Sequence, residues 1–155
     1  MIKINVITNN TNWLKYIKYP DDYLNKRVKK INLKDKEFKK NKIYCTLLLS
    51  GNQEIKYLNK KFRNKNKPTD VLSFPFLTKK EFKNELKEKK EIYLGDIIVN
   101  LSKIKKKNIN FSFKDEFDRL WIHGLVHLLG HDHKNESDYL SMSKVEKKYL
   151  KFIND

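Results

Sequence analysis

The 155-residue chain contains one cysteine, three prolines, four glycines and no alanine. The single Cys45 excludes a disulfide bond within the chain, and its apolar surroundings predict a small buried thiol. No apolar run approaches the roughly 20 residues that a membrane-spanning helix needs, and the opening MIKINVITNN lacks the long apolar stretch of a signal peptide. We therefore expect one cytoplasmic domain over residues 1–155 with no membrane contact.

Two common nucleotide-binding signatures are also missing, because the chain has neither a Walker loop nor a dinucleotide fingerprint. Positive charge is abundant instead: 35 lysines and arginines against 19 acidic residues give a net charge of +16. Such a charge favours polyanions, above all nucleic acid. The absence of alanine and the wealth of lysine, asparagine and isoleucine would equally follow from a biased genome. Charge alone therefore leaves nucleic-acid binding undecided.

Arginine is scarce within this basic set, which contains only Arg27, Arg63 and Arg119 beside the lysines. A planar guanidinium offers phosphate or carboxylate a two-pronged contact that lysine cannot reproduce. Arg119 follows Asp115 by four residues and Glu116 by three, so an ion pair within one helix accounts for it. Arg63 stands among lysines, and the residues alone are compatible with a solvated helix end or with a functional cation.

All four histidines lie in the run HGLVHLLGHDH at residues 123–133. Residues four apart share one face of an α-helix, so His123 and His127 can present two imidazole nitrogens to one ion. Gly130 allows the chain to reverse at the helix end, which would bring His133 toward the first two. Three such nitrogens suit one tetrahedral zinc ion with the fourth position left to water. The same nitrogens also suit another divalent transition metal, such as nickel or iron, so the identity of the metal stays open. We expect His131 to be a loop residue or a group that supports the site.

Hydrophobic periodicity predicts strands that alternate with helices, and thus an α+β fold. The strands are expected over residues 2–8, 43–50, 69–76 and 92–100, with Pro75 at a sheet edge and a bulge at Gly95 and Asp96. Helices are expected over residues 21–31, 55–63, 114–129 and 136–152, the last burying Leu140, Val145, Tyr149 and Phe152. The helix at 114–129, entered through Ser112, is apolar nearly all round and should lie at the domain's centre. The charged residues 79–91 are expected to form an exposed, mobile excursion.

The predicted zinc ion can lower the pKa of a bound water to about 7, which suits hydrolysis. In the zinc protease signature His-Glu-x-x-His, the glutamate beside the first histidine acts as the general base. Gly124 occupies that position here, which disfavours peptide hydrolysis. A metal and an arginine can assist cleavage of a phosphodiester without a carboxylate at this position.

Three motifs occur together in this chain: PTDVLSFPF at residues 68–76, LGDI at 94–97 and the histidine run at 123–133, with LNKKFR at 58–63. A chain with these motifs resembles the YbeY endoribonucleases, metal-dependent enzymes of ribosomal RNA maturation. The resemblance implies a mixed sheet of about four strands with helices on its faces and the histidine helix at the centre. It also implies zinc on His123, His127 and His133, and it places Arg63 at the family's catalytic arginine.

The same resemblance implies a single-strand-specific endoribonuclease that matures the 3′ end of 16S ribosomal RNA and acts on defective ribosomes. Its partners would be ribosomal RNA, the small ribosomal subunit and associated assembly factors. The chain departs from the family at His131, where an aromatic residue is usual, so His131 could tune the site or compete as a ligand. Two other functions stay open: an RNA-binding assembly factor with structural zinc, and a different zinc hydrolase or metalloprotease.

Overall fold

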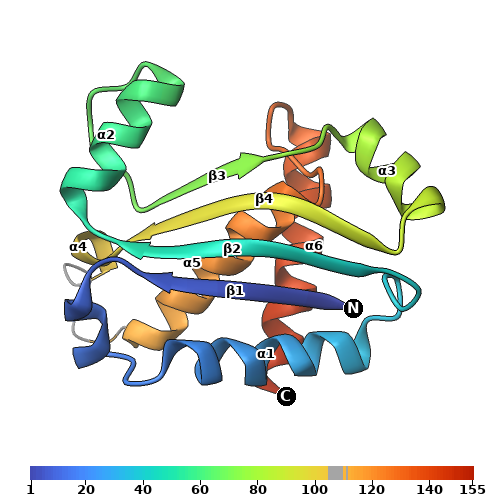
Figure 1. Cartoon of the computed structure of the whole chain (residues 1–155), viewed down its shortest axis with the longest axis horizontal. Helices are drawn as coiled ribbons and strands as arrows, with labels where there is room; N and C mark the ends of the chain where they lie inside the picture. Colours follow the sequence, from blue (N-terminus) through green and yellow to red (C-terminus); the bar gives the residue numbers. More distant parts are fainter. Residues whose placement is uncertain (105–109, 111) are drawn as a thin grey trace.

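The computed structural model describes residues 1–104, 110 and 112–155. Four strands and six α-helices form an α+β architecture (Figure 1). The strands are β1 Ile2–Thr8, β2 Lys42–Ser50, β3 Val71–Pro75 and β4 Glu91–Asn100. The helices are α1 Pro20–Lys34, α2 Asn52–Arg63, α3 Lys79–Glu88, α4 Leu101–Ile104, α5 Phe113–Leu128 and α6 Glu136–Asn154, with a 3-10 helix η1 at Thr11–Lys15.

The sheet is mixed, with the strand order β1-β2-β4-β3. Strands β1, β2 and β4 are parallel, and β3 runs antiparallel to β4 at the edge. The edge position of β3 confirms the prediction from Pro75, since proline cannot donate a hydrogen bond to a second neighbour. The apolar run at residues 43–50 forms β2, which is interior because β1 and β4 flank it.

The predicted bulge lies in β4. Tyr44 pairs with Tyr93 and Thr46 pairs with Asp96, so β4 has one residue more than β2 between these two pairs. Gly95 adopts a φ of 128° there, and a Cβ atom at this position would lie 2.1 Å from the carbonyl oxygen of Phe74. Glycine is therefore needed at this point, because any side chain would collide with the backbone of β3.

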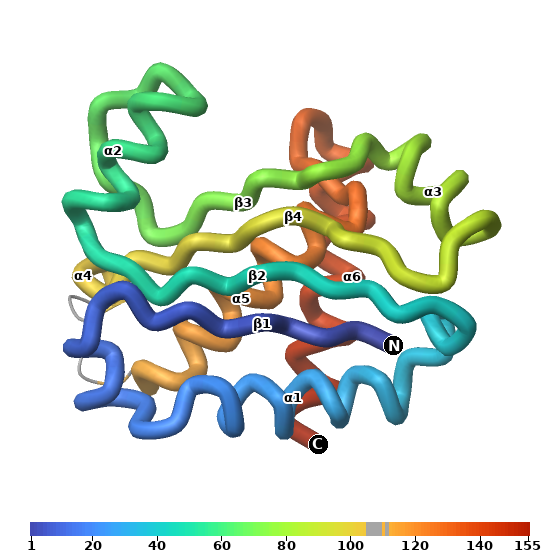
Figure 2. The backbone as a smooth tube through the Cα atoms, in the orientation of Figure 1, coloured from blue at the N-terminus to red at the C-terminus, as the bar shows by residue number. Residues whose placement is uncertain are grey.

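Alternation along the strands gives the sheet two different faces. One face carries Ile43, Cys45, Leu47 and Leu49 of β2 into the main core, which helices α1, α5 and α6 complete. Figure 2 shows α5 and α6 running behind the strands, while α2 stands at one end of the opposite face. On that face a smaller apolar cluster joins α2 to the sheet through Ile55, Leu72 and Ile98.

Helix α5 is buried at the centre, as its sequence predicts. Ser112 caps it, since its hydroxyl accepts a hydrogen bond from the backbone N–H of Asp115 at 3.4 Å. Phe117, Trp121 and Leu125 are fully buried in the main core. Asp118 is buried too, and it accepts hydrogen bonds from Trp121 at 2.8 Å and from Arg27 of α1 at 2.7 Å. This ion pair joins α5 to α1.

The prediction for residues 79–91 was wrong, because Lys79–Glu88 forms α3. Thr78 and Glu81 make a reciprocal capping box at its start, and the ring of Phe82 is buried against that of Phe38 with centroids 6.0 Å apart. The apolar face of α3 consists of Phe82 and, one turn later, Leu86. Most other residues of this segment are charged, so the sequence does not show an extended apolar periodicity.

Two further expectations about helices need correction. Helix α1 begins at Pro20, whose fixed φ suits a first helical position, and not after Asp21 or Asp22. In α6 the buried residues are Met142, Tyr149 and Ile153, whereas Leu140 is 54% exposed. Residues two apart on a helix point to nearly opposite sides, so Met142 and Leu140 cannot both face the core. Within the part of the chain that the structure describes, no helix is long and apolar enough to traverse a lipid bilayer.

Helix α5 lies close against the sheet at Gly124. A Cβ atom there would lie 2.6 Å from Cγ2 of Ile97 and 3.2 Å from Oγ of Ser73. We predict that Gly124→Ala lowers the free energy of unfolding by about 1–2 kcal/mol, because overpacking of about 1–3 kcal/mol outweighs the helix propensity that alanine adds. Urea denaturation measures this change. The surface variant Leu140→Ala should stay within about 0.5 kcal/mol of wild type; an equally small effect at Gly124 would contradict the close packing.

Candidate metal centre

The histidine run begins inside α5 and ends in the turn that follows it. After Leu128 the chain reverses at Gly130, which has a φ of 94°. The N–H of His131 bonds to the carbonyl of Val126 at 3.2 Å, and the N–H of Gly130 bonds to that of His127 at 2.9 Å. These two bonds form a Schellman motif, which satisfies the last carbonyls of the helix and turns the chain back along it.

The reversal brings the three predicted ligands together. Every pair among His123, His127 and His133 has candidate ligand nitrogens within 4.8 Å, and this trio is the cluster of potential metal ligands found among the described residues. The Nε2 atoms of His123 and His127 are 3.2 Å apart. Two nitrogens bound to one tetrahedral zinc ion at about 2.0–2.1 Å lie about 3.3–3.4 Å apart, so the spacing fits a shared ion.

Hydrogen bonds at the other ring nitrogens fix how these two imidazoles are protonated. Nδ1 of His123 faces Oε1 of Glu146 at 2.6 Å, and Nδ1 of His127 faces the carbonyl oxygen of His131 at 3.0 Å. Both oxygens only accept, so each Nδ1 carries the proton and donates. In the neutral rings both Nε2 atoms then hold lone pairs that point at each other, an arrangement that a cation between them stabilises.

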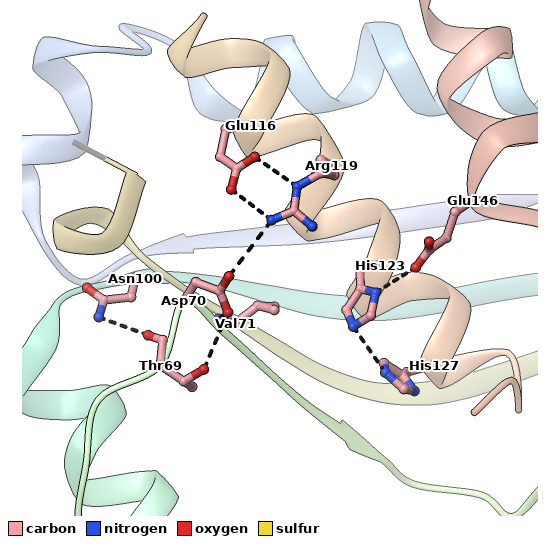
Figure 3. Close-up of polar contacts among 9 residues, drawn as sticks. All are labelled: Thr69, Asp70, Val71, Asn100, Glu116, Arg119, His123, His127 and Glu146. Atoms are coloured by element: carbon pink, nitrogen blue, oxygen red, sulfur yellow. Dashed lines mark hydrogen bonds and ion pairs between the residues drawn. The ribbon is translucent and has the colours of Figure 1, made fainter. Parts of the chain in front are cut away.

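Glu146 is the residue of this site that sequence reasoning missed. It lies on α6, 23 residues after His123, and Figure 3 shows its carboxylate meeting the outer edge of the His123 ring. A carboxylate that accepts from a metal-binding histidine orients the ring and makes the ligand nitrogen more basic. No local pattern in the sequence distinguishes Glu146 as a partner of His123 from Glu136, the other glutamate of the last helix.

Burial also favours the neutral form of His127. Desolvation, followed by the neighbouring charge of His123 when protonated, lowers the pKa of His127 below its ordinary value. Since only an unprotonated nitrogen binds a metal, this shift keeps His127 ready to act as a ligand at lower pH than an exposed histidine.

His131 does not join the trio. Its backbone carbonyl orients His127, and its side chain lines a cavity of about 600 Å³ together with Phe76, Lys79 and His127. Burial and the charge of Lys79 lower the pKa of His131. The expectation that His131 is a loop residue or a group that supports the site is thus met through its backbone carbonyl.

Arg63 lies outside the histidine cluster, at the last turn of α2. Its Nη2 atom donates to the carbonyl oxygen of Ser73 at 3.0 Å, and its guanidinium lies 5.9 Å from the ring centroid of Phe74. The side chain of Ser73 points the other way, toward Gly124 of α5. The guanidinium is therefore fixed at the free edge of β3, one strand away from the helix that carries the histidines. Its catalytic role stays a prediction.

The other two arginines are paired with carboxylates. Arg119 makes two hydrogen bonds of 2.8 Å to the buried Glu116, and it also lies 3.9 Å from Asp70 (Figure 3). The intrahelical ion pair predicted for Arg119 is thus confirmed with Glu116. Among the described residues, no carboxylate pairs with Arg63, so its charge remains available to an anion.

The environment of Gly124 explains why the protease glutamate is absent. Position 124 points into the sheet at Ile97, and not toward the imidazoles. A glutamate side chain would not fit there, and it could not reach a substrate bound at the metal. The site consequently offers three imidazole ligands, without the general base that helical zinc proteases use.

We predict that Glu146→Gln weakens zinc binding by about 10- to 100-fold, because the amide accepts a weaker hydrogen bond from His123 than the carboxylate does. Competition with a chromophoric chelator measures this affinity. Glu136→Gln, on an exposed turn of the same helix, is the matched control and should leave the affinity unchanged. Equal affinities for both variants would show that Glu146 does not support the metal site.

Comparison with known proteins agrees with this geometry. Residues 7–154 match the family described as Endoribonuclease YbeY. A protein of Pelagibacter ubique with that name is 48% identical over 155 residues, which cover 99% of this chain and 97% of the relative. A second, from Thermodesulfovibrio yellowstonii, is 38% identical over 81% of this chain and 74% of its own.

A solved structure shares the fold as well. The solution structure of a protein from Thermotoga maritima aligns with a TM-score of 0.54 at 26% sequence identity, covering 99% of this chain and 89% of that one. The matched range extends over nearly the whole chain and contains the positions of the three clustered histidines and of Arg63. The chain therefore belongs to the Endoribonuclease YbeY family.

Proposed function

We propose that the protein is a zinc-dependent endoribonuclease that cuts single-stranded RNA during ribosomal RNA maturation and ribosome quality control. The observation that carries this proposal is the trio of imidazoles, with the Nε2 atoms of His123 and His127 3.2 Å apart, in a chain of the Endoribonuclease YbeY family. The substrate would be the 3′ end of 16S ribosomal RNA, on the small subunit and with its assembly factors. Such a role places the protein in the cytoplasm.

His123, His127 and His133 would hold the ion. When bound, zinc supplies Lewis acidity toward a phosphoryl oxygen and lowers the pKa of water in its open position to about 7. Glu146 and the carbonyl of His131 orient two of the rings before substrate arrives. The site is therefore preorganised, so little reorganisation is needed when charge develops on the phosphate.

Arg63 would stabilise that developing charge. One of its five N–H donors is used by the carbonyl of Ser73, which fixes the guanidinium, and among the described residues this is the hydrogen bond that the side chain makes. A neutral carbonyl holds the group in place without cancelling its charge. This is the arrangement expected of an arginine that must bind a phosphate oxygen in one defined place.

Neither alternative function has the same support. A metalloprotease needs a general base, and the packing of Gly124 against Ile97 leaves no room for the glutamate of the helical zinc proteases. An RNA-binding factor with structural zinc would close the coordination sphere with a fourth protein ligand. The described residues provide three clustered ligands, which favours an open fourth position.

We predict that His123→Ala and His127→Ala each abolish zinc binding and reduce cleavage of a single-stranded RNA oligonucleotide to background. Metal analysis of the purified variants and gel assays of cleavage provide the two measurements. His131→Ala, which removes a neighbouring imidazole outside the trio, should retain one zinc per chain. A strong chelator should stop cleavage by wild type, and added zinc should restore it. Full cleavage by a metal-free variant would end the proposal, and zinc-loaded wild type that binds RNA without cutting it would favour the assembly-factor alternative.

For Arg63 we predict that Arg63→Ala lowers kcat by about 10²–10³-fold with zinc content unchanged, as expected for the loss of one preorganised donor to transition-state charge. Arg63→Lys should recover little, because an ammonium cannot hold the carbonyl of Ser73 and a phosphate oxygen in the same plane. Lys65→Ala removes a neighbouring exposed charge and should change kcat far less. Similar values of kcat for the Arg63 and Lys65 variants would reduce Arg63 to a general surface charge.

A further inference from the structure

The face of the sheet turned away from α5 carries a row of side chains that the proposed chemistry does not use. Lys3 of β1 is in register with Tyr44 of β2, and Tyr44 with Tyr93 of β4. Phe76 continues the row just beyond the end of β3. The neighbours of Tyr44 and Tyr93 along their strands are buried in the main core, so these tyrosines point to the opposite face.

The three rings of the row contact one another. The centroids of Tyr44 and Tyr93 are 5.3 Å apart, and those of Tyr93 and Phe76 are 5.9 Å apart. The hydroxyl of Tyr93 donates to Asp96 and lies 3.3 Å from the hydroxyl of Thr46, which fixes the tyrosine. Phe76 is 71% exposed, although burial of a phenylalanine ring normally stabilises a fold. Tyr44 and Tyr93 are half-buried. This aromatic row (Tyr44, Tyr93 and Phe76) is thus an ordered surface of two partly exposed rings and one exposed ring.

The aromatic row leads to the candidate metal centre. Phe76 lines the same cavity of about 600 Å³ as His127 and His131. From that cavity the row runs across β4 and β2 toward Lys3 on β1. Figure 1 shows no helix in front of this part of β2 and β4, since α5 and α6 lie behind the strands and α2 and α3 stand at the two ends.

Charge indicates what could cover this face. Residues 55–69, in α2 and the loop after it, contain six cations and no acid. The six are Lys56, Lys60, Lys61, Arg63, Lys65 and Lys67. Helix α2 packs on the same face through Ile55, and the guanidinium of Arg63 at its end lies 5.9 Å from the ring centroid of Phe74, two residues before Phe76. The cationic segment therefore approaches the aromatic row at Arg63.

Lys3 adds an exposed cation at the other end of the aromatic row. On the strands, Asp96 is an exposed acid beside Tyr93, and Lys42 neutralises Glu91 at 2.9 Å. The cavity that Phe76 lines also contains Glu81, Asp132 and Asp138, together with Lys79 and Lys134.

Flat aromatic rings bordered by cations are suited to a polyanion whose bases are unpaired. Base faces are accessible in a single strand, whereas in a duplex they are covered by neighbouring base pairs. Stacking on exposed rings is tolerant of sequence, and cations beside the rings neutralise the phosphates. A duplex would offer the row only its backbone, which gives aromatic rings nothing to stack on.

We propose that the aromatic row is a binding track for single-stranded RNA, in which bases adjoining the cleaved nucleotide stack on Phe76, Tyr93 and Tyr44 while Lys3 and the cationic segment at residues 55–69 contact phosphates. The track rests on the proposed function, because it delivers the strand to the metal centre. It supplies a physical reason for a preference for single strands that lies outside the metal site.

The test compares variants of Phe76 in the zinc-loaded protein. Phe76→Leu keeps an apolar side chain but removes the ring, and Phe76→Trp keeps a ring that can stack. We expect Phe76→Leu to weaken binding of a fluorescein-labelled 12-nucleotide oligoadenylate roughly 5- to 100-fold and Phe76→Trp to restore it. Fluorescence anisotropy measures the affinity, in incubations short enough for gels to show uncut RNA. Tyr19→Leu, which alters a 61% exposed ring at the start of α1, should stay within twofold of wild type.

An abasic oligonucleotide of the same length separates stacking from charge, because it keeps the phosphates and lacks the bases. Wild type and Phe76→Leu should bind it equally, and more weakly than wild type binds oligoadenylate. Equal affinity of wild type and Phe76→Leu for oligoadenylate would overturn the track. Unchanged RNA affinity together with lost association with small ribosomal subunits would also overturn it and identify the row as a protein-docking surface.

Cleavage kinetics distinguish failure of the track from failure of the proposed function. If both hold, Phe76→Leu raises KM while kcat changes little, since Phe76 contacts bases and not the reacting phosphate. Normal KM in Phe76→Leu and in Tyr44→Leu would refute the track and leave the nuclease intact. A wild-type protein that needs the ring for binding yet never cuts RNA would refute the nuclease and support the track. Urea denaturation confirms that each variant is folded.

Discussion

Helix α5 lies directly on the sheet at Gly124, where the absence of a side chain lets the helix approach Ile97 and Ser73. This contact fixes both the distance of the helix from the sheet and its rotation about its own axis. With position 124 against the sheet, His123 and His127 lie on another side of the helix, where Glu146 of α6 accepts a hydrogen bond from His123 and the carbonyl of His131 accepts one from His127. The same contact leaves no room for a glutamate at position 124. The packing of Gly124 against the sheet therefore orients the metal ligands and also excludes the general base that helical zinc proteases use.

Buried charges hold α5 in this orientation. Glu116 and Asp118 are both almost fully buried, and unpaired carboxylates in such places would be strongly destabilising. Arg119 neutralises the first and Arg27 the second, with Tyr23 adding a hydrogen bond to Asp118 at 3.0 Å. Burial still raises the pKa of Asp118, even though Arg27 opposes the shift. Two of the three arginines thus serve the fold, and the third, Arg63, is held by a neutral carbonyl.

Strand β3 separates two parts of the proposed function. On its inner side the side chain of Ser73 meets the histidine helix, while on its outer side Arg63 lies over the ring of Phe74. Phe76, just past the end of the strand, contacts Tyr93 of the outer face and also lines the cavity that contains His127. A strand of RNA lying across the outer face would reach the metal by passing over this short edge. An edge strand ended by proline suits this position, because it leaves its outer side open.

The sequence by itself determined features that depend on neighbouring residues. These are the four strands, the edge at Pro75, the bulge at Gly95 and the trio of His123, His127 and His133, whose spacing lies within one helix and one turn. Helix α3 has two signals in the sequence, its capping box and the apolar Phe82, but the many charged residues of the segment favour an exposed loop. Only the tertiary structure decided that Glu146 meets His123, that Arg63 is held by Ser73 and that three aromatic rings line up across the sheet. The strands, the bulge and the histidine trio follow from helix and strand geometry over a few neighbouring residues. The contacts of Glu146, Arg63 and the aromatic rings depend on how distant segments pack, and the spacing of neighbouring residues does not determine that packing.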